Sequence, residues 1–340
     1  MRLRLPAALG GAHSFSTGQI VMKRLKTVVM PRSGRASRVA VALLFILACG
    51  NVACGPARAE DTPKLHNEYV QIQYLPPRSD KYQQLYEKLE KRQILEELDA
   101  FLSPLDLGEN GLVLSAEEGD DSCKGPNSYY DGRGTLHLCY SWFYFLENEV
   151  AKEYPLPPGE TFSLTSPGLI PGFTRMDVVL GGSVSVTLHE LGHAIFDLLS
   201  IPRFGREEDA ADQFAGFFMV QFGPQVALTT VKGTYNAWHH FNAERIAQSK
   251  GVLNAGLEAD PHSLDIQRAY NFLCLAYGKD EATFKDLAES LLPRVRREHC
   301  KEEYGQAELA FKKTLLPKID VERMKQVQAM GIFRPEDFKF

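Results

Sequence analysis

The sequence contains two histidines four residues apart with a glutamate directly after the first: His189, Glu190 and His193. On a helix, positions i and i+4 lie on one face, so both imidazoles can reach a single metal ion. The carboxylate of Glu190 then points to the open side of the metal, where it can act as a general base toward water. This spacing predicts metal-dependent hydrolysis, but a catalytic zinc site needs a third protein ligand.

An acidic helix start, with Glu208 fifteen residues after His193, offers candidates for that ligand. Glu208 and Asp212 share one helix face, and we predict Glu208 as the third ligand and Asp212 as the acceptor for a histidine N–H. Glu207 and Asp209 compete for the ligand role, but we interpret both as acids that complement the helix dipole. Small side chains let this helix pack close to the first one: Ala210, Ala211, Ala215 and Gly216.

The elements that position these side chains are two consecutive helices. The first is expected over Met176–Leu199 and the second over Glu207–Phe222, because Pro and Gly follow each of them. The first helix is apolar around the histidines, so they are expected to be buried and to need polar partners. Asp197, one turn after His193, either bonds a ligand histidine or caps a solvated edge.

The remaining sequence indicates a mixed N-terminal half and a helical C-terminal half. The N-terminal patterns are strands at Glu68–Tyr74, Leu112–Leu114 and Thr135–Tyr140, helices at Asp80–Leu102 and Trp142–Tyr154, and a loop at Pro155–Gly172. We interpret Thr135–Tyr140 as an edge strand that can pair with an extended peptide. Residues 225–340 contain four or five helical patterns and almost no strand signal. His239–His240 shows no helical spacing to another His or acid, which favours packing or a surface position.

The first 59 residues have the composition of a secretory signal. They contain nine Lys/Arg and no Asp or Glu, followed by an apolar run at Val39–Cys49 and small residues before Glu60. We therefore expect residues 1–59 to be a removed signal and residues 60–340 to be one domain. An N-terminal membrane anchor is the alternative, although the run is shorter than the roughly 20 residues that span a bilayer. Translation could also start at Met22 or Met30, and Cys49 is a candidate site for lipidation.

Charge and cysteine content limit the classes of function. Without the signal, 29 Lys/Arg remain against 43 Asp/Glu, a formal charge of −14, which argues against binding to nucleic acid. Four cysteines also remain, and an even number in an exported chain indicates two disulfides. Three pairings are possible, and the simplest is Cys123–Cys139 with Cys274–Cys300. A cysteine-ligated zinc site is the rival interpretation, but the chain has no C-x-x-C.

The residues around the histidine motif resemble known metallopeptidases. The pattern Glu208-x-x-Ala211-Asp212-x-x-Ala215 after HExxH is similar to gluzincins and minigluzincins, in which this Glu is the third zinc ligand. A closer resemblance is to a bacterial family of uncharacterised metallopeptidases. It rests on HELGHAIFDLL, GREEDAADQFA, HSLDIQRAYNFLCLAYG and the Cys-x-x-Glu-Tyr at 300–304, and it covers most of residues 110–310.

The resemblance implies an α+β, zincin-like fold with a small N-terminal sheet, an active-site helix pair and a mainly helical C-terminal half. It also implies one Zn²⁺ ion. His262 and Arg268 match a His and an Arg that related zincins carry behind the site. There the His stabilises the oxyanion, and Arg268 would hold neighbouring carboxylates. The alternative is an N-cap region with a hydrogen-bonded core histidine.

The leading hypothesis is an exported zinc peptidase, periplasmic or secreted, that acts on peptides or proteins. A second hypothesis is a non-catalytic zinc-binding scaffold of the cell envelope, against which the intact Glu190 argues. A third is a zinc amidase that acts on a non-protein amide. The mature chain is expected to have no stable transmembrane segment, and its sequence indicates neither the substrate nor the oligomeric state.

Overall fold

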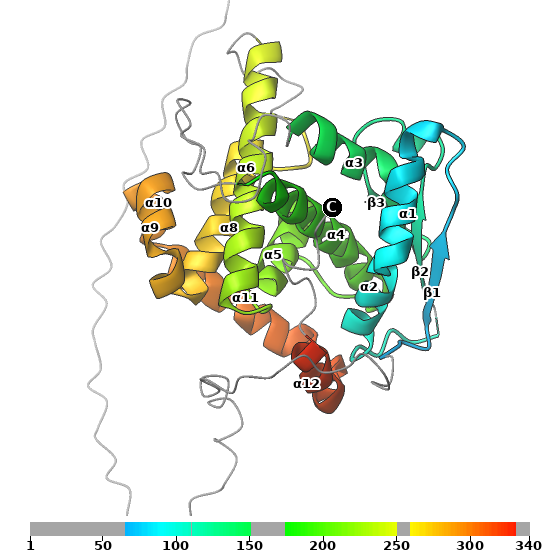
Figure 1. The fold of residues 1–340 in the computed structure, drawn as a ribbon. Helices are drawn as coiled ribbons and strands as arrows, with labels where there is room; N and C mark the ends of the chain where they lie inside the picture. Colours follow the sequence, from blue (N-terminus) through cyan, green and yellow to red (C-terminus); the bar gives the residue numbers. More distant parts are fainter. Residues whose placement is uncertain (1–64, 110, 151–173, 250–258, 331–340) are drawn as a thin grey trace, which may run out of the picture. The chain divides into compact units, whose positions relative to one another are not determined.

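The computed structural model describes residues 65–109, 111–150, 174–249 and 259–330. The expected signal at 1–59 and the expected loop at 155–172 lie outside the described residues. Figure 1 shows a long central helix, α4 (Arg175–Leu198), with the sheet and the first helices on one side and the C-terminal helices on the other. The fold is therefore a mixed α+β arrangement around the helix that carries the histidines.

The sheet has four strands: β1 (Val70–Tyr74), β2 (Leu112–Glu117), β3 (Tyr129–Tyr130) and β4 (Thr135–Cys139). Their order is β1-β2-β4-β3, with β3 antiparallel to β4 and the other pairs parallel. The prediction that Thr135–Tyr140 is an edge strand is therefore wrong. Gly132 and Gly134 take positive φ, which lets the chain turn and lay β3 along the outer side of β4.

The first helical region is also broken where one helix was predicted. It forms η1 (Asp80–Tyr82), α1 (Gln83–Arg92) and α2 (Ile94–Leu102). Gln93 is left-handed, with φ 59°, and its N–H bonds to the last carbonyls of α1. After β4, the chain continues as α3 (Tyr140–Phe145) and a π-helical turn, η3 (Leu146–Val150).

Helix α4 begins at a capping box. The Thr174 hydroxyl accepts from the Asp177 N–H, and the Asp177 carboxylate accepts from the Thr174 N–H. The helix crosses α6 (Pro224–Gln248) so closely that a Cβ on Gly181 would lie 2.5 Å from the Cα of Gly233. This crossing requires glycine on both helices.

The second site helix is α5 (Glu207–Met219), and it packs against α4 through small residues. Ala211 and Ala215 are fully buried, and a Cβ on Gly192 of α4 would lie 3.4 Å from the Cα of Ala211. Gly216 differs from the prediction because it faces α8 (Asp265–Lys279) rather than α4. A Cβ there would lie 2.7 Å from a methyl carbon of Leu275.

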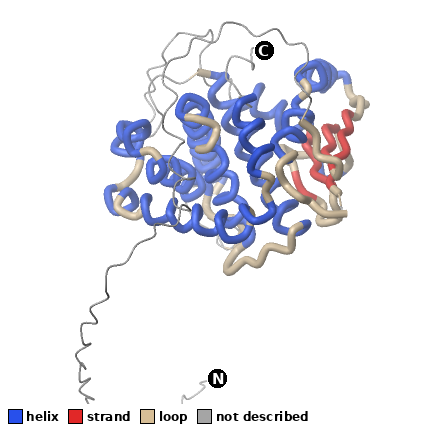
Figure 2. The backbone as a smooth tube through the Cα atoms, turned by 90° about the horizontal axis from the view of Figure 1, so that it is seen from below, coloured by secondary structure: helices blue, strands red, loops and turns tan. Residues whose placement is uncertain are grey.

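The C-terminal half is helical where it is described, as expected. Figure 2 shows the strands gathered in one part of the fold, with helices forming the rest of the described structure. Its helices after α6 are α8 (Asp265–Lys279), α9 (Glu281–Leu291), α10 (Arg294–Arg297), α11 (Cys300–Thr314) and α12 (Val321–Met330). Both expected disulfides are present. Cys274–Cys300 links α8 to α11, and Cys123–Cys139 links the 3-10 helical turn η2 (Asp121–Cys123) to the end of β4. Within the described ranges, no helix is long and apolar enough to span a membrane.

Candidate metal centre

Three side chains from α4 and α5 converge on one point. The Nε2 atoms of His189 and His193 are 3.2 Å apart, and the Oε2 atom of Glu208 lies 3.1 Å from the first and 3.2 Å from the second. Ligands at the usual Zn–N and Zn–O distances of about 2.0–2.1 Å, arranged tetrahedrally, would be about 3.3 Å from one another. The donor set and its spacing therefore fit a zinc ion with one open position. Among the described residues, this trio is the group whose ligand atoms could hold a metal.

The other ring nitrogen of each histidine faces a carboxylate. Nδ1 of His189 is 2.8 Å from Asp212, as was expected for a carboxylate partner, and Nδ1 of His193 is 3.0 Å from Glu207. A proton held at Nδ1 leaves the lone pair of Nε2 free to bind a metal. Glu207 was interpreted as an acid that only complements the helix dipole, and the structure gives it a contact with His193 as well. Its position, fourteen residues after His193, has no periodicity that could have revealed this contact.

Behind His189, a buried ion pair fixes the position of Asp212. Arg268 donates from Nε and Nη2 to the two oxygens of Asp212, each at 2.7 Å, and its guanidinium lies 3.6 Å from the ring centre of Trp238. Asp212 and Arg268 are only 4% and 6% exposed. The sequence indicated that Arg268 holds a carboxylate, but it gave no sign of the contact with Trp238.

The charges of these groups are strongly coupled. Burial lowers the pKa of His189, but hydrogen bonds to Asp212 and Glu208 outweigh burial and raise this pKa to about 9. Burial raises the pKa of Asp212, whereas the charge of Arg268 and the bond to His189 lower it to about 2. Hydrogen bonds from the histidines also hold the pKa of Glu208 well below its usual value. Without metal, the ionised carboxylates are therefore paired with Arg268 and with a protonated His189, so a metal ion would replace a proton when it binds.

Glu190 lies beside this trio and is held by the sheet. Its Oε1 atom is 3.9 Å from Nε2 of His189, and its Oε2 atom accepts a hydrogen bond of 3.0 Å from the backbone N–H of Tyr130. Burial raises the pKa of Glu190, and the neighbouring histidine charges oppose that shift. The Tyr130 hydroxyl donates to Asp197 at 2.7 Å and accepts from the Gly134 N–H. Asp197 is exposed and bonds Tyr130, so it ties α4 to β3 at a solvated edge and not to a ligand histidine.

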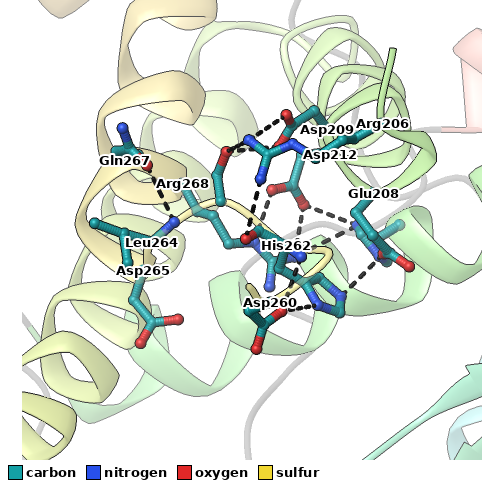
Figure 3. A network of polar contacts seen from close by, with 12 residues as sticks. Arg206, Glu208, Asp209, Asp212, Asp260, His262, Leu264, Asp265, Gln267 and Arg268 are labelled. Carbon is teal, nitrogen blue, oxygen red and sulfur yellow. Dashed lines mark hydrogen bonds and ion pairs between the residues drawn. The ribbon is translucent and has the colours of Figure 1, made fainter. Parts of the chain in front are cut away.

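His262 also reaches the centre. Its Nε2 atom is 2.9 Å from Oε2 of Glu208, its Nδ1 atom is 3.0 Å from Asp260, and its ring stacks against that of His189. Figure 3 shows this group at the point where α5 faces the start of α8. Its proposed contact with an oxyanion remains a prediction, because here its Nε2 faces Glu208.

A surface contact holds the His262 loop in place. Asp209 accepts a hydrogen bond of 2.6 Å from the Ser263 hydroxyl and forms an ion pair with Arg206 at 2.8 Å. Arg206 in turn donates to Ser263 at 2.9 Å. Asp209, like Glu207, therefore has a specific partner in addition to any effect on the helix dipole.

The centre opens into a cleft of about 440 Å³. The described residues that line it include His189, Glu190, His262 and Arg268. The expectation that His239–His240 has no acidic partner at helical spacing is wrong, because Nε2 of His240 lies 3.4 Å from Glu244, four residues later. This contact lies outside the metal trio.

Comparison with known proteins gives one family. A family model described as "Putative metallopeptidase" matches residues 74–315. This match begins earlier in the chain than the resemblance over residues 110–310 that the sequence motifs indicated. No curated protein and no solved structure matches the chain. The zincin-like fold therefore remains a prediction, whereas the mixed α+β architecture is observed.

Proposed function

The chain belongs to this "Putative metallopeptidase" family, and on that premise we propose that it is an exported zinc-dependent peptidase that hydrolyses peptide bonds. The observation that carries the proposal is the 3.1–3.2 Å spacing of His189 Nε2, His193 Nε2 and Glu208 Oε2 beside the Glu190 carboxylate. Two imidazoles and one carboxylate that leave a fourth position open are the donor set of catalytic zinc in several hydrolases.

A zinc ion in this position would polarise the substrate carbonyl and lower the pKa of water to about 7. Glu190 would accept the proton of the attacking water and deliver it to the leaving amine, the combined base and acid role. The Tyr130 N–H occupies one oxygen of that carboxylate at 3.0 Å, so the other oxygen is the one available for proton transfer. His262, oriented by Asp260, would donate a hydrogen bond to the developing oxyanion.

Export of the protein is supported by two independent features. The basic and apolar pattern of residues 1–59 is that of a signal, and the two disulfides are typical of oxidising compartments. We propose a periplasmic or secreted location, with residues 60–340 as the mature domain. The formal charge of −14 of that domain favours peptide or protein substrates over nucleic acid.

Turnover of a mixed peptide library by the zinc-loaded mature protein tests the proposal, with Glu190→Gln as the comparison. Gln keeps the size of the side chain and its bond to Tyr130 but cannot accept the proton. We expect hydrolysis by the wild type and a loss of at least about a hundredfold in the variant, with equal zinc content. Equal rates would contradict the enzyme hypothesis and support a zinc-binding scaffold. Inactivity on peptides with activity on a non-protein amide would instead support the amidase.

A further inference from the structure

The cleft beside Glu190 has one wall made of aromatic rings. Trp142 and Phe145 lie three residues apart on α3, and Trp238 and Phe241 lie three residues apart on α6, so each pair shares a helix face. The Phe241 ring centre is 5.7 Å from Trp142, 5.6 Å from Phe145 and 5.4 Å from Trp238. All four residues line the cleft together with Glu190.

Two rings of this wall, Phe145 and Phe241, are more exposed than the aromatic core, whereas Trp142 and Trp238 are buried. Phe272 and Phe284 are each 1% exposed, as core side chains usually are. Phe145 and Phe241 are only partly buried, and their rings stack almost in parallel, at 12°. They therefore present apolar ring surface to the cleft, where a further ring could stack or meet them edge-on.

The wall lies close to the position of the chemistry. Val186 also lines the cleft, and it precedes Glu190 by four residues on the same face of α4. One helical turn separates these two residues by about 6 Å. A side chain packed between Val186 and the aromatic wall therefore belongs to the substrate residue next to the bond that Glu190 serves.

The charged residues Glu244 and Arg245, which also line the cleft, make a poor site for an acidic side chain. Arg245 lines the cleft, but its Nε is 2.8 Å from Asp265 and its Nη1 is 3.7 Å from Asp260, so two carboxylates offset one cation. At the wall itself, the Arg268 guanidinium already covers a face of the Trp238 ring, so that face is not open to a basic side chain of the substrate.

We propose that this cleft is a specificity pocket for an aromatic side chain, Phe or Tyr in character, on the substrate residue that flanks the scissile bond. The proposal rests on the proposed peptidase function. The aromatic wall formed by Trp142, Phe145, Trp238 and Phe241 recognises the ring, and Val186 lines the cleft one helical turn before Glu190.

Binding and turnover are tested separately. Trp142 and Trp238 are the only two tryptophans of the chain and both line the cleft, so intrinsic fluorescence reports on its occupation. The probes are tryptophan-free peptides that differ at one position, which carries Phe, Leu, Lys or Ala. With zinc-loaded Glu190→Gln, the Phe peptide is expected to bind about tenfold to a hundredfold tighter than the Ala peptide. The wild type should show the same order in kcat/KM.

Three variants connect the preference to the wall. Phe241→Ala is expected to lower the Phe-to-Ala ratio to within about threefold of one, because Phe241 touches the three other rings. Phe145→Ala removes a ring that contacts fewer of the other rings and should also lower the Phe-to-Ala ratio. This variant tests the wall even if Phe241→Ala does not fold. Phe222→Ala is the matched control, since Phe222 packs against Phe101 away from the cleft and should leave the ratio unchanged.

The outcomes separate this inference from the proposed function. A Phe preference in binding that the wall variants remove, without turnover by the wild type, supports the pocket and contradicts the peptidase. Turnover without a Phe preference, or with a preference for Lys, contradicts the proposed aromatic pocket but remains consistent with the proposed peptidase function. An unchanged ratio in both Phe145→Ala and Phe241→Ala also overturns the pocket.

Discussion

The buried ion pair behind His189 leads to the sharpest quantitative prediction. Asp212→Asn keeps the shape of the side chain but removes the charge that Arg268 and His189 both contact, at 2.7 and 2.8 Å. Removing one partner of a buried ion pair costs about 3–5 kcal/mol, because the other charge stays buried without compensation. Arg268 is 6% exposed and cannot reach water without rearrangement. We therefore expect the free energy of unfolding of the metal-free protein to fall by about 3–5 kcal/mol.

The same substitution should weaken zinc binding for a different reason. His189 loses the carboxylate that orients its ring, and such a loss typically costs about 10- to 100-fold in metal affinity. Combining Asp212→Asn with Arg268→Met removes the uncompensated charge, so most of the stability should return while zinc affinity stays low. Asp209→Asn is the control, because Asp209 lies on the same helix but its ion pair with Arg206 is exposed, and it should cost less than about 1 kcal/mol.

Urea unfolding with chelator present and both disulfides intact measures the stability, and competition with a zinc indicator measures the affinity. The reasoning is refuted if Asp212→Asn costs no more than Asp209→Asn. It is also refuted if the double variant is less stable than Asp212→Asn alone, because Arg268 would then stabilise the fold without Asp212.

Three further predictions follow from the geometry. Because the pKa of His189 is about 9 without metal, that ring is protonated at pH 7, so zinc binding should release at least one proton and tighten as pH rises toward 9. Calorimetry in two buffers of different ionisation enthalpy checks this, and equal heats would contradict it. Tyr130→Phe loses the hydrogen bond to Asp197 that holds β3, and with it the backbone N–H that positions Glu190. It should lower kcat several-fold with unchanged KM and zinc content. A change in KM alone would argue against this positioning role. Gly233→Ala should destabilise the protein by about 2–3 kcal/mol, because a Cβ there would overlap the backbone of α4. Gly305→Ala is the control, since a Cβ at Gly305 would meet open space and should not destabilise the protein. Similar midpoints of urea unfolding for the two variants would contradict this prediction.

The helices that carry the proposed metal ligands could be predicted because their signals are local. Periodic apolar residues, a Pro or Gly after each helix and a four-residue histidine spacing gave α4 and α5 to within three residues at each end. The position of Glu208 beside the histidines could be predicted from the helix face that it shares with Asp212. The disulfide pairing could be predicted because the cysteines of each pair are close in sequence. Each of these features depends on neighbours along the chain.

The features that were missed depend on tertiary contacts or on short turns. Gln93 breaks a predicted helix because a left-handed residue satisfies the end of α1, although glutamine rarely takes that conformation. Strand β3 has only two residues, Tyr129–Tyr130, and the signal for it was the Asp-Gly-Arg-Gly turn that follows. The pairing of Glu207 with His193 depends on the angle between α4 and α5, which the sequence does not encode locally.

Zinc affinity tests the central claim most directly, with Glu208→Gln compared with Glu207→Gln. The two residues are neighbours on α5, and each contacts a histidine of the trio, but Glu208 alone approaches both Nε2 atoms. The account predicts about one zinc per wild-type chain and a loss of affinity at least tenfold greater for Glu208→Gln than for Glu207→Gln. Equal losses in the two variants, or full zinc affinity in Glu208→Gln, would contradict it.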